Sequence, residues 1–460
     1  MDWTYMSDLV GKTVKMLEKK GITSAEAFFT MSDTTEVSIR NSEILTQNNL
    51  RDSGVGFRVE VDNRVGFACT NEINDKSLNT AAEKALSIAR VSAEVPHFAL
   101  PQPGDILPVK KGYDSRVAEM TGDDAVDMAH RLIAASEGYD SRVIAKSGRV
   151  VLISGWRGVL NTLGVDCEEQ ETKAVLYLGG VGEQPGEVTG SCFDYAFSRT
   201  SDISPEKVGQ AVGKRVVEMF NPQPLHSFTG TVIFGPEACS YQIVDALIDA
   251  LKGENVMAGR SIWEKKIGKK VASEQLTITD DALRENGFSS RSFDDEGCPS
   301  RCTHVIEKGV LTQYLQNATT AAFLNMENTG NACRSPGGFD MVRNIIGSGY
   351  RTAPEPYPSN LVIHPGTSSR EILISDVEKG VLIESMAGFT QAGSGLISAQ
   401  LSQAFFIKNG EIQHAVKGGM VSGVAFDWLN NVSGIGNDTM QFNNAVVPSL
   451  RVEDVTVVGT

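Results

Sequence analysis

The hydrophobic residues of this chain change their spacing several times along the sequence, and this limits the folds open to it. Apolar side chains recur at helical spacing over residues 6–20, 77–92, 123–136 and 205–219. Residues 55–69 instead alternate apolar and polar positions around a turn at Asp62 and Asn63, which predicts a β-hairpin. Residues 142–200 resemble a meander of strands. Because helices and strands do not alternate regularly, we expect an α+β fold and not a parallel βαβ fold.

A proline-containing segment divides the chain at Asn221-Pro222-Gln223-Pro224. Proline cannot continue the preceding helix, because it lacks the amide proton and clashes with the turn before it. We therefore expect an N-terminal α/β domain with a meandering antiparallel sheet over residues 1–221, and a strand-rich C-terminal domain over residues 225–460. In the second domain we expect a helix over residues 237–251, ended by Gly253. Strands are expected at residues 231–234, 361–364, 371–374, 380–384 and 404–407.

The charge balance of the 460 residues excludes several classes of protein. The 42 basic and 57 acidic side chains give a net charge of −15, which argues against a protein that coats nucleic acid. No run approaches the ~20 apolar residues that a membrane helix needs. Charged residues from Asp2 to Glu18 interrupt any signal peptide, so we expect a cytoplasmic location. The seven cysteines are scattered, so we expect reduced thiols.

The common short catalytic motifs, such as HExxH, GxSxG and the phosphate loop, are absent from the sequence. Cys298, Cys302 and His304 form the only cluster of ligand type. Thiolate and imidazole suit zinc, but this spacing matches no common zinc finger. The ordinary alternative is a pair of small strand residues and a hydrogen-bonded histidine, and we favour it.

Two groups of acidic residues also require interpretation. We expect Asp294, Asp295 and Glu296 to form a solvated turn; the alternative is a cluster that binds a hard cation or the amine end of a peptide. Asp245 and Asp249 are four residues apart in the expected helix, so they face one direction. We expect them to form the wet edge of an amphipathic helix.

Several longer segments occur in an order that is typical of one family. They are residues 38–63, 292–315 (SFDDEGCPSRCTHVIEKGVLTQYL), 328–331 (NTGN), 406–416, 432–438 (VSGIGND) and 448–459 (PSLRVEDVTVVG). Together they resemble the TldD/PmbA family, also called TldD/TldE, over nearly the whole chain. The collinear order of the segments is more specific than any one of them.

The resemblance implies a degenerate metal site in this chain. TldD-like members carry HExxxH on a helix and a distal cysteine, which together bind zinc; PmbA/TldE-like members lack them. Alignment on residues 232–235 and 252–254 puts the HExxxH motif at residues 244–249, where Val244, Asp245 and Asp249 replace the two histidines and the glutamate. The distal cysteine has no counterpart after residues 435–438. This places the chain in the PmbA/TldE-like branch, with no intact catalytic group and no metal of its own.

The resemblance also implies a function in proteolysis. A PmbA/TldE-like chain is expected to combine with a TldD-like metallopeptidase subunit, which holds the zinc, in a homo- or hetero-dimeric assembly that encloses unfolded peptide. Such pairs are linked to peptide maturation and to degradation of small unstable proteins. The sequence assigns no residue to peptide binding, and we expect no nucleic-acid or membrane partner. The alternative is a self-sufficient homodimeric peptidase or hydrolase that uses Cys298, Cys302 and His304. A third reading, a modulator of DNA gyrase, rests on a family label alone.

Overall fold

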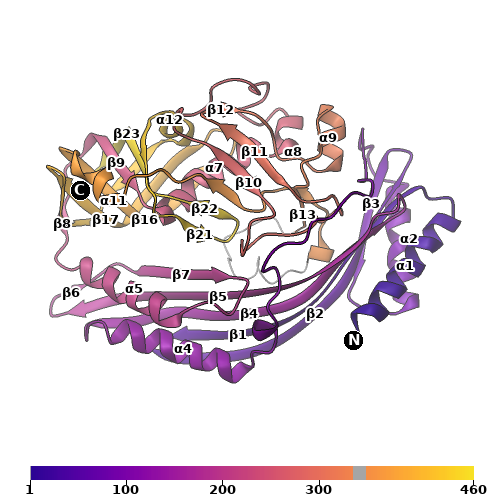
Figure 1. The fold of residues 1–460 in the computed structure, drawn as a ribbon, viewed down its shortest axis with the longest axis horizontal. Coiled ribbons are helices and arrows are strands. Elements are labelled where there is room, and N and C mark those ends of the chain that lie inside the picture. The colour runs from indigo at the N-terminus through magenta and orange to yellow at the C-terminus, as the bar shows by residue number, and fades with distance from the viewer. Residues whose placement is uncertain (1, 335–348, 460) are drawn as a thin grey trace.

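A long antiparallel sheet forms one side of the molecule (Figure 1). The computed structural model describes residues 2–334 and 349–459. The sheet has the order β3-β2-β1-β4-β5-β6, with β7 also paired to β5. Its strands are β1 (Ser24–Arg40), β2 (Glu43–Val61), β3 (Arg64–Thr70), β4 (Val143–Asn161), β5 (Asp166–Gln184), β6 (Glu187–Val188) and β7 (Cys192–Ser198). The predicted hairpin and the predicted meander both belong to this sheet, which confirms the α+β assignment.

Capped helices pack on this sheet. They are α1 (Trp3–Lys19), α2 (Asp75–Ala89), α3 (Ser115–Ala118), α4 (Gly122–Glu137) and α5 (Pro205–Glu218). The Asp2, Asn74 and Ser204 side chains each accept a backbone N–H in the first turn of the next helix, and Thr121 and Asp124 form a capping box. Helices α1 and α2 bury their apolar stripes against the end of the sheet that carries β3, while α4 and α5 pack farther along it.

The C-terminal part is built around a closed barrel. Strands β9 (Phe228–Phe234), β16 (Lys379–Gln391), β17 (Leu396–Lys408), β19 (Met420–Val424) and β23 (Leu450–Val458) pair in a ring, because β16 bonds to both β9 and β17. Strand β18 (Glu411–Lys417) pairs with β17, β20 (Val432–Ile435) with β23, and β8 (Gln223–Pro224) with β18. Residues 223 and 224, in the segment expected to divide the chain, are therefore paired to the C-terminal sheet.

A second sheet and short helices complete this part. The sheet contains β10 (Ile278–Asp281), β11 (Cys302–Glu307), β12 (Val310–Leu311), β15 (Leu361–Ile363), β21 (Met440–Phe442) and β22 (Ala445–Val447). Strands β13 (Ala332–Cys333) and β14 (Glu355–Pro356) form a small ladder. The short helices are α8 (Gly253–Met257), α9 (Ala318–Leu324), the 3₁₀ turn Gly349–Arg351, α11 (Arg370–Ser375) and α12 (Ala425–Asn430). In the described part of the chain, no helix has the length and hydrophobicity to cross a membrane.

One expectation for the C-terminal part is wrong, and one element differs in detail. Residues 371–374 form the helix α11 and not a strand, because the Ser369 hydroxyl caps the Ile372 N–H and only Leu373 and Ile374 are buried. The helix expected over residues 237–251 is present as one continuous helical run, which consists of α6 (Pro236–Ala238), a π-helical turn (Cys239–Ile243) and α7 (Val244–Leu251). Gly253 does not end this helix as a cap, since Lys252 is extended and Gly253 begins α8.

Candidate functional site

Helix α7 carries the positions that the family resemblance singled out, and it crosses the core of the C-terminal part. One side of α7 is almost entirely apolar and packs into the main hydrophobic cluster there, through Leu247 and Leu251 among others. The π-helical turn directly before it widens the backbone, and such turns are frequent at functional sites. The other side of α7 faces a recess.

This recess has a volume of about 240 Å³. Its walls come from segments far apart in the sequence: α7, Lys252, Tyr357, the turn between β16 and β17, and Phe426 on α12. The Thr390 hydroxyl donates to the Gln242 carbonyl oxygen at 3.1 Å and so fixes β16 to the π-helical turn. The Lys252 ammonium group lies 3.1 Å from Glu355 and 5.9 Å from the centre of the Tyr357 ring. We call this cavity the α7 recess.

The two aspartates of α7 behave differently in this recess. Asp245 is exposed, and within the described residues no hydrogen bond or ion pair reaches it. Desolvation by the surrounding protein raises the pKa of its carboxyl group to about 6. Asp249 is half-buried, and both of its carboxylate oxygens accept hydrogen bonds. One of its oxygens accepts the Asn255 side-chain amide at 2.7 Å, and the other accepts the Gly393 N–H at 2.5 Å. Asp249 thus holds the β16–β17 turn in place, while Asp245 is available to a ligand.

The residues at the HExxxH positions do not fit a zinc ion. Val244 is 2% exposed and packs in the hydrophobic core, so it does not line the recess and has no donor atom to offer. Both Asp249 oxygens already accept hydrogen bonds. Zinc sites in proteins use at least three protein ligands, and within residues 2–334 and 349–459 no group of three His, Cys, Asp or Glu side chains is arranged to hold a metal.

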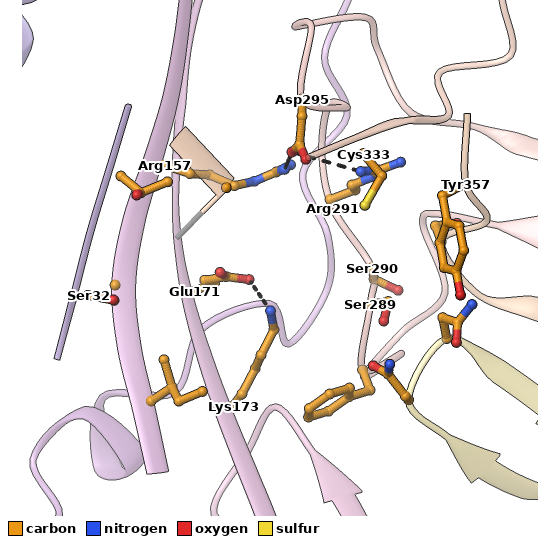
Figure 2. Close-up of a pocket in the computed structure, with 18 of the residues that line it drawn as sticks. Ser32, Arg157, Glu171, Lys173, Ser289, Ser290, Arg291, Asp295, Cys333 and Tyr357 are labelled. Atoms are coloured by element: carbon orange, nitrogen blue, oxygen red, sulfur yellow. Dashed lines mark hydrogen bonds and ion pairs between the residues drawn. The ribbon is translucent and has the colours of Figure 1, made fainter. Parts of the chain in front are cut away.

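A second cavity lies between the long sheet and the C-terminal part. It has a volume of about 170 Å³, and Tyr357 lines both cavities. Figure 2 shows Arg157 and Arg291 directed toward Asp295 on one wall and Lys173 directed toward Glu171 on another. The nearby cations Lys173 and Arg199 hold the pKa of Glu171 at about 2 in spite of its burial. We call this polar cavity the inter-sheet pocket.

The acidic run expected to be a solvated turn is buried: Asp294 and Glu296 are 0% exposed and Asp295 is 7% exposed. Asp294 accepts the backbone N–H groups of Glu296, Cys298 and Ala332, each at 2.9 Å. The expectation failed because Ala332, Arg157 and Arg58, which donate to these carboxylates, are distant in sequence. Burial and the adjacent Glu296 raise the pKa of Asp294.

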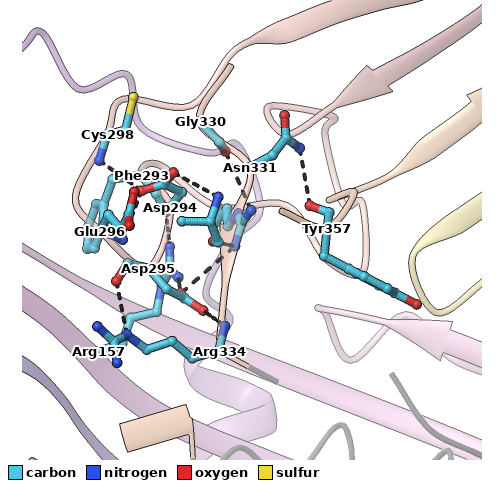
Figure 3. Close-up of polar contacts among 12 residues, drawn as sticks. Arg157, Phe293, Asp294, Asp295, Glu296, Cys298, Gly330, Asn331, Arg334 and Tyr357 are labelled. Carbon is cyan, nitrogen blue, oxygen red and sulfur yellow. Dashed lines mark hydrogen bonds and ion pairs between the residues drawn. The ribbon is translucent and has the colours of Figure 1, made fainter. Parts of the chain in front are cut away.

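These carboxylates fasten the C-terminal part to the long sheet (Figure 3). Asp295 accepts Arg157 of β4 at 2.6 Å and the Arg334 N–H at 2.7 Å. Glu296 accepts Arg58 of β2 at 2.6 Å and the Ala318 N–H at 2.9 Å. Since the oxygens of this run already have protein donors, the run is a structural junction and not a free cation or amine site.

The thiol cluster predicted as the alternative site does not assemble into a reactive centre. Cys302 and His304 lie on the same exposed side of β11, as expected, whereas Cys298 lies in the turn after Asp294. Burial and the negative charges of Asp294 and Glu296 raise the pKa of the Cys298 thiol. Partial desolvation and the charge of Asp281 raise the pKa of the exposed Cys302 thiol. A nucleophilic cysteine needs the opposite shift.

Sequence reasoning did not identify a buried ionic cluster where α5 and β7 meet α6 and β16. Arg215 lies 3.2 Å from Asp194 and 2.9 Å from Glu237, and Glu237 also accepts the Ser385 hydroxyl at 2.8 Å. Burial raises the pKa of Glu237 to about 7 and that of Asp194 to about 6. No sequence spacing connects these residues. The recess residues Tyr357 and Gln391 were missed for the same reason.

Comparisons with known proteins agree with the resemblance. A sequence model of the PmbA/TldA metallopeptidase C-terminal domain matches residues 227–459, and models of domain 1 and of the central domain match residues 25–89 and 116–220. A metalloprotease of Methanothermobacter thermautotrophicus is 33% identical over 61% of this chain and 59% of its own length. Metalloprotease PmbA of Escherichia coli O157:H7 is 24% identical over 97% of this chain and 96% of its own length. The crystal structure of TldE from Thermococcus kodakarensis has the same fold, with a TM-score of 0.89 at 24% identity over 98% of this chain and 100% of that one.

Proposed function

Because this chain belongs to the PmbA/TldD metallopeptidase family, we propose that it is the PmbA/TldE-like, non-catalytic subunit of a peptidase complex that acts on unfolded peptides. The zinc and the catalytic glutamate belong, in this proposal, to a TldD-like partner subunit. This chain contributes part of the wall that encloses the peptide, and it works in the cytoplasm.

The observation that carries the proposal is the set of side chains that α7 has at the HExxxH positions. The helix keeps its place beside a solvent-open recess, yet Val244 points into the core and Asp249 is fixed to Gly393 and Asn255. A hydrolytic zinc site needs three protein ligands and an open position for water. A helix that has lost its ligands but retains its recess suits a subunit that binds peptide without cleaving it.

The lining of the α7 recess supports a peptide ligand of low sequence specificity. Asp245 offers an unpaired carboxylate to a peptide ammonium group, and Tyr357 offers an aromatic face, while Lys252 is already paired with Glu355. Tyr357 also lines the inter-sheet pocket, whose walls carry both positive and negative side chains. These groups recognise features that every peptide has.

Two measurements test the proposal. Elemental analysis of the untagged chain is expected to find no stoichiometric zinc, and one equivalent of zinc per chain would contradict the loss of the ligands. Size-exclusion chromatography of this chain mixed with a TldD-like chain from the same cell is expected to give a peak that contains both. If the two chains elute separately at all ratios, the proposed partnership is wrong.

A further inference from the structure

Two cations share the carboxylate of Glu171 on the β5 wall of the inter-sheet pocket. The Lys173 ammonium group lies 3.2 Å from this carboxylate, and the Arg199 guanidinium group lies 3.7 Å from it. The other bonds of the Arg199 side chain go to the backbone carbonyl oxygens of Gly112 and Ser290, which carry no net charge. Glu171 therefore neutralises the charge of one cation and leaves the charge of the other uncompensated.

The remaining charged groups of the pocket balance one another. Arg157 donates to Glu169 and to Asp295, each at 2.6 Å, and Arg291 lies 3.9 Å from Asp295. Among the described residues, the ion pairs of the pocket therefore contain one positive charge in excess, and it lies beside Glu171. A charge that is partly removed from water is costly unless an opposite charge meets it.

Lys173 is the cation that a ligand can reach. Its side chain is 18% exposed, whereas that of Arg199 is 2% exposed and is bonded to backbone oxygens. A lysine ammonium group has three N–H donors. Within the described part of the chain Glu171 is its one ion-pair partner, so donors remain for an anionic ligand.

The wall on the other side of the pocket also presents donors. Arg291 Nε and Asn444 Nδ2 are buried, and within residues 2–334 and 349–459 neither has a hydrogen-bond acceptor. Figure 2 shows Ser289 and Tyr357 of this wall across the pocket from Lys173. Buried N–H donors in proteins are normally paired, so this wall suits a ligand with acceptor oxygens.

The rest of the lining is apolar. It consists of Phe28 and Met31 of β1, Ile153 and Trp156 of β4, and Phe288. A bare inorganic anion has no group for these side chains to contact, whereas the end of a peptide combines a carboxylate with carbon atoms. The volume of about 170 Å³ is below the ~300 Å³ at which pockets for drug-sized ligands begin. The pocket therefore suits the end of a chain and not a longer segment.

We propose that the inter-sheet pocket binds the C-terminal carboxylate of a short peptide, with Lys173 as the cation that receives it. The choice of a peptide rests on the proposed function, whereas the choice of a carboxylate rests on the charges and donors of the pocket itself. Tyr357 lines both this pocket and the α7 recess, which contains Asp245. The two cavities thus suit opposite ends of a peptide, the carboxylate in one and the ammonium group in the other.

Isothermal titration calorimetry of the purified full chain with two peptides tests this inference. One is N-acetyl-Ala-Ala-Phe with a free carboxylate, and the other is the same peptide as its C-terminal amide. The acetyl group removes the ammonium charge, so the contact proposed for Asp245 does not contribute. We expect the acid to bind, and the amide to bind about 10- to 100-fold more weakly, because it lacks the charged acceptor for Lys173.

Two lysine variants locate the binding site. Lys173→Met keeps a side chain of similar length without its charge, and we expect it to bind the acid as weakly as the amide. Lys270→Met is the matched control, because Lys270 also pairs with a glutamate, Glu274, but is 57% exposed and lies outside the pocket. It is expected to bind both peptides as wild type does. Thermal unfolding checks the fold of each variant, and the comparison of acid with amide on the wild type needs no variant.

Equal affinity of the wild type for the acid and the amide overturns the proposal, and so does a Lys173→Met variant that still prefers the acid. A wild-type chain that binds neither peptide overturns it as well. Acetate is the third ligand: if it binds as tightly as the peptide acid, the pocket takes any small carboxylate and the assignment to a peptide end is wrong. The experiment uses this chain alone, so a failure to form a complex with a TldD-like chain refutes the proposed function without changing its result.

Discussion

The buried charges around Glu26 lead to a large and specific stability prediction. Glu26 in β1 and Arg58 in β2 are direct cross-strand partners. Glu26 is 0% exposed and accepts Arg58 at 2.9 Å, and it also accepts the fully buried Arg334. Arg58 in turn donates to Glu296 at 2.6 Å. The positive charges of Arg58 and Arg334 thus balance the negative charges of Glu26 and Glu296 in the interior.

Glu26→Gln removes one negative charge from this cluster and leaves a net positive charge without contact with water. Removal of one partner from a buried ion pair costs about 3–5 kcal/mol, because the remaining charge stays desolvated and uncompensated. We expect a loss of this size in the free energy of unfolding, measured by urea denaturation at neutral pH. Tryptophan fluorescence and circular dichroism should report coincident transitions, which checks that a single free energy describes the unfolding.

A surface pair and a double variant serve as controls. Glu83→Gln removes an exposed partner of Lys20, with side chains 55% and 43% exposed, and is expected to cost less than about 1 kcal/mol. Glu26→Gln combined with Arg58→Gln restores the charge balance, so the pair should cost less than the sum of the two single changes. If Glu26→Gln costs no more than Glu83→Gln, the charge balance of the buried cluster does not stabilise the fold.

Three further predictions concern other parts of the fold. Asp249→Ala should lower the free energy of unfolding by about 1–3 kcal/mol, because the Gly393 N–H in the β16–β17 turn then has no acceptor. Asp245→Asn should change it by no more than about 0.5 kcal/mol, and urea denaturation of the two variants compares these values. Gly66→Ala should destabilise the fold strongly, since a Cβ at this position comes within 2.0 Å of the α2 backbone. Gly11→Ala has its nearest neighbour at 3.9 Å and should stabilise α1 by about 0.5–1 kcal/mol. If both variants lose stability, the packing argument is wrong. Burial raises the pKa of Glu237 to about 7, above its unfolded value. The stability that the protonated carboxyl group contributes is therefore full below about pH 4.5 and is lost as the pH rises to about 7. Glu237→Gln should flatten the fall in the free energy of unfolding over this range, and an unchanged pH profile would contradict the raised pKa.

The local signals in the sequence predicted the helices α1, α2, α4 and α5, the hairpin of β2 and β3, and the strand-rich region of β4, β5 and β7, but they did not predict β1. The period of the apolar residues and the caps at Asn74, Thr121 and Ser204 are properties of neighbouring residues, so they can be read without the fold. The four residues from Glu371 to Ile374 were too few to distinguish a helix from a strand, and the cap at Ser369 decided the outcome. The π-helical turn before α7 has no sequence signature of its own.

The buried charges could not be predicted from the sequence. Asp294, Asp295 and Glu296 follow one another and resemble a hydrated turn, yet their partners Arg58 and Arg157 come from strands more than a hundred residues away. A carboxylate is stable in the interior only when such partners are present. The same limit applies to the α7 recess, whose walls are brought together by the fold alone. The expectation that Val244, Asp245 and Asp249 occupy the HExxxH positions, by contrast, rests on the resemblance alone.

The most direct test of the proposed function measures peptidase activity on an unfolded peptide with three samples: this chain alone, a TldD-like chain from the same cell alone, and the two mixed. The non-catalytic role predicts no activity from this chain alone, and activity in the mixture that a zinc chelator abolishes. Activity from this chain alone that resists the chelator would contradict the proposal, and it would make Cys298, Cys302 and His304 the first residues to replace.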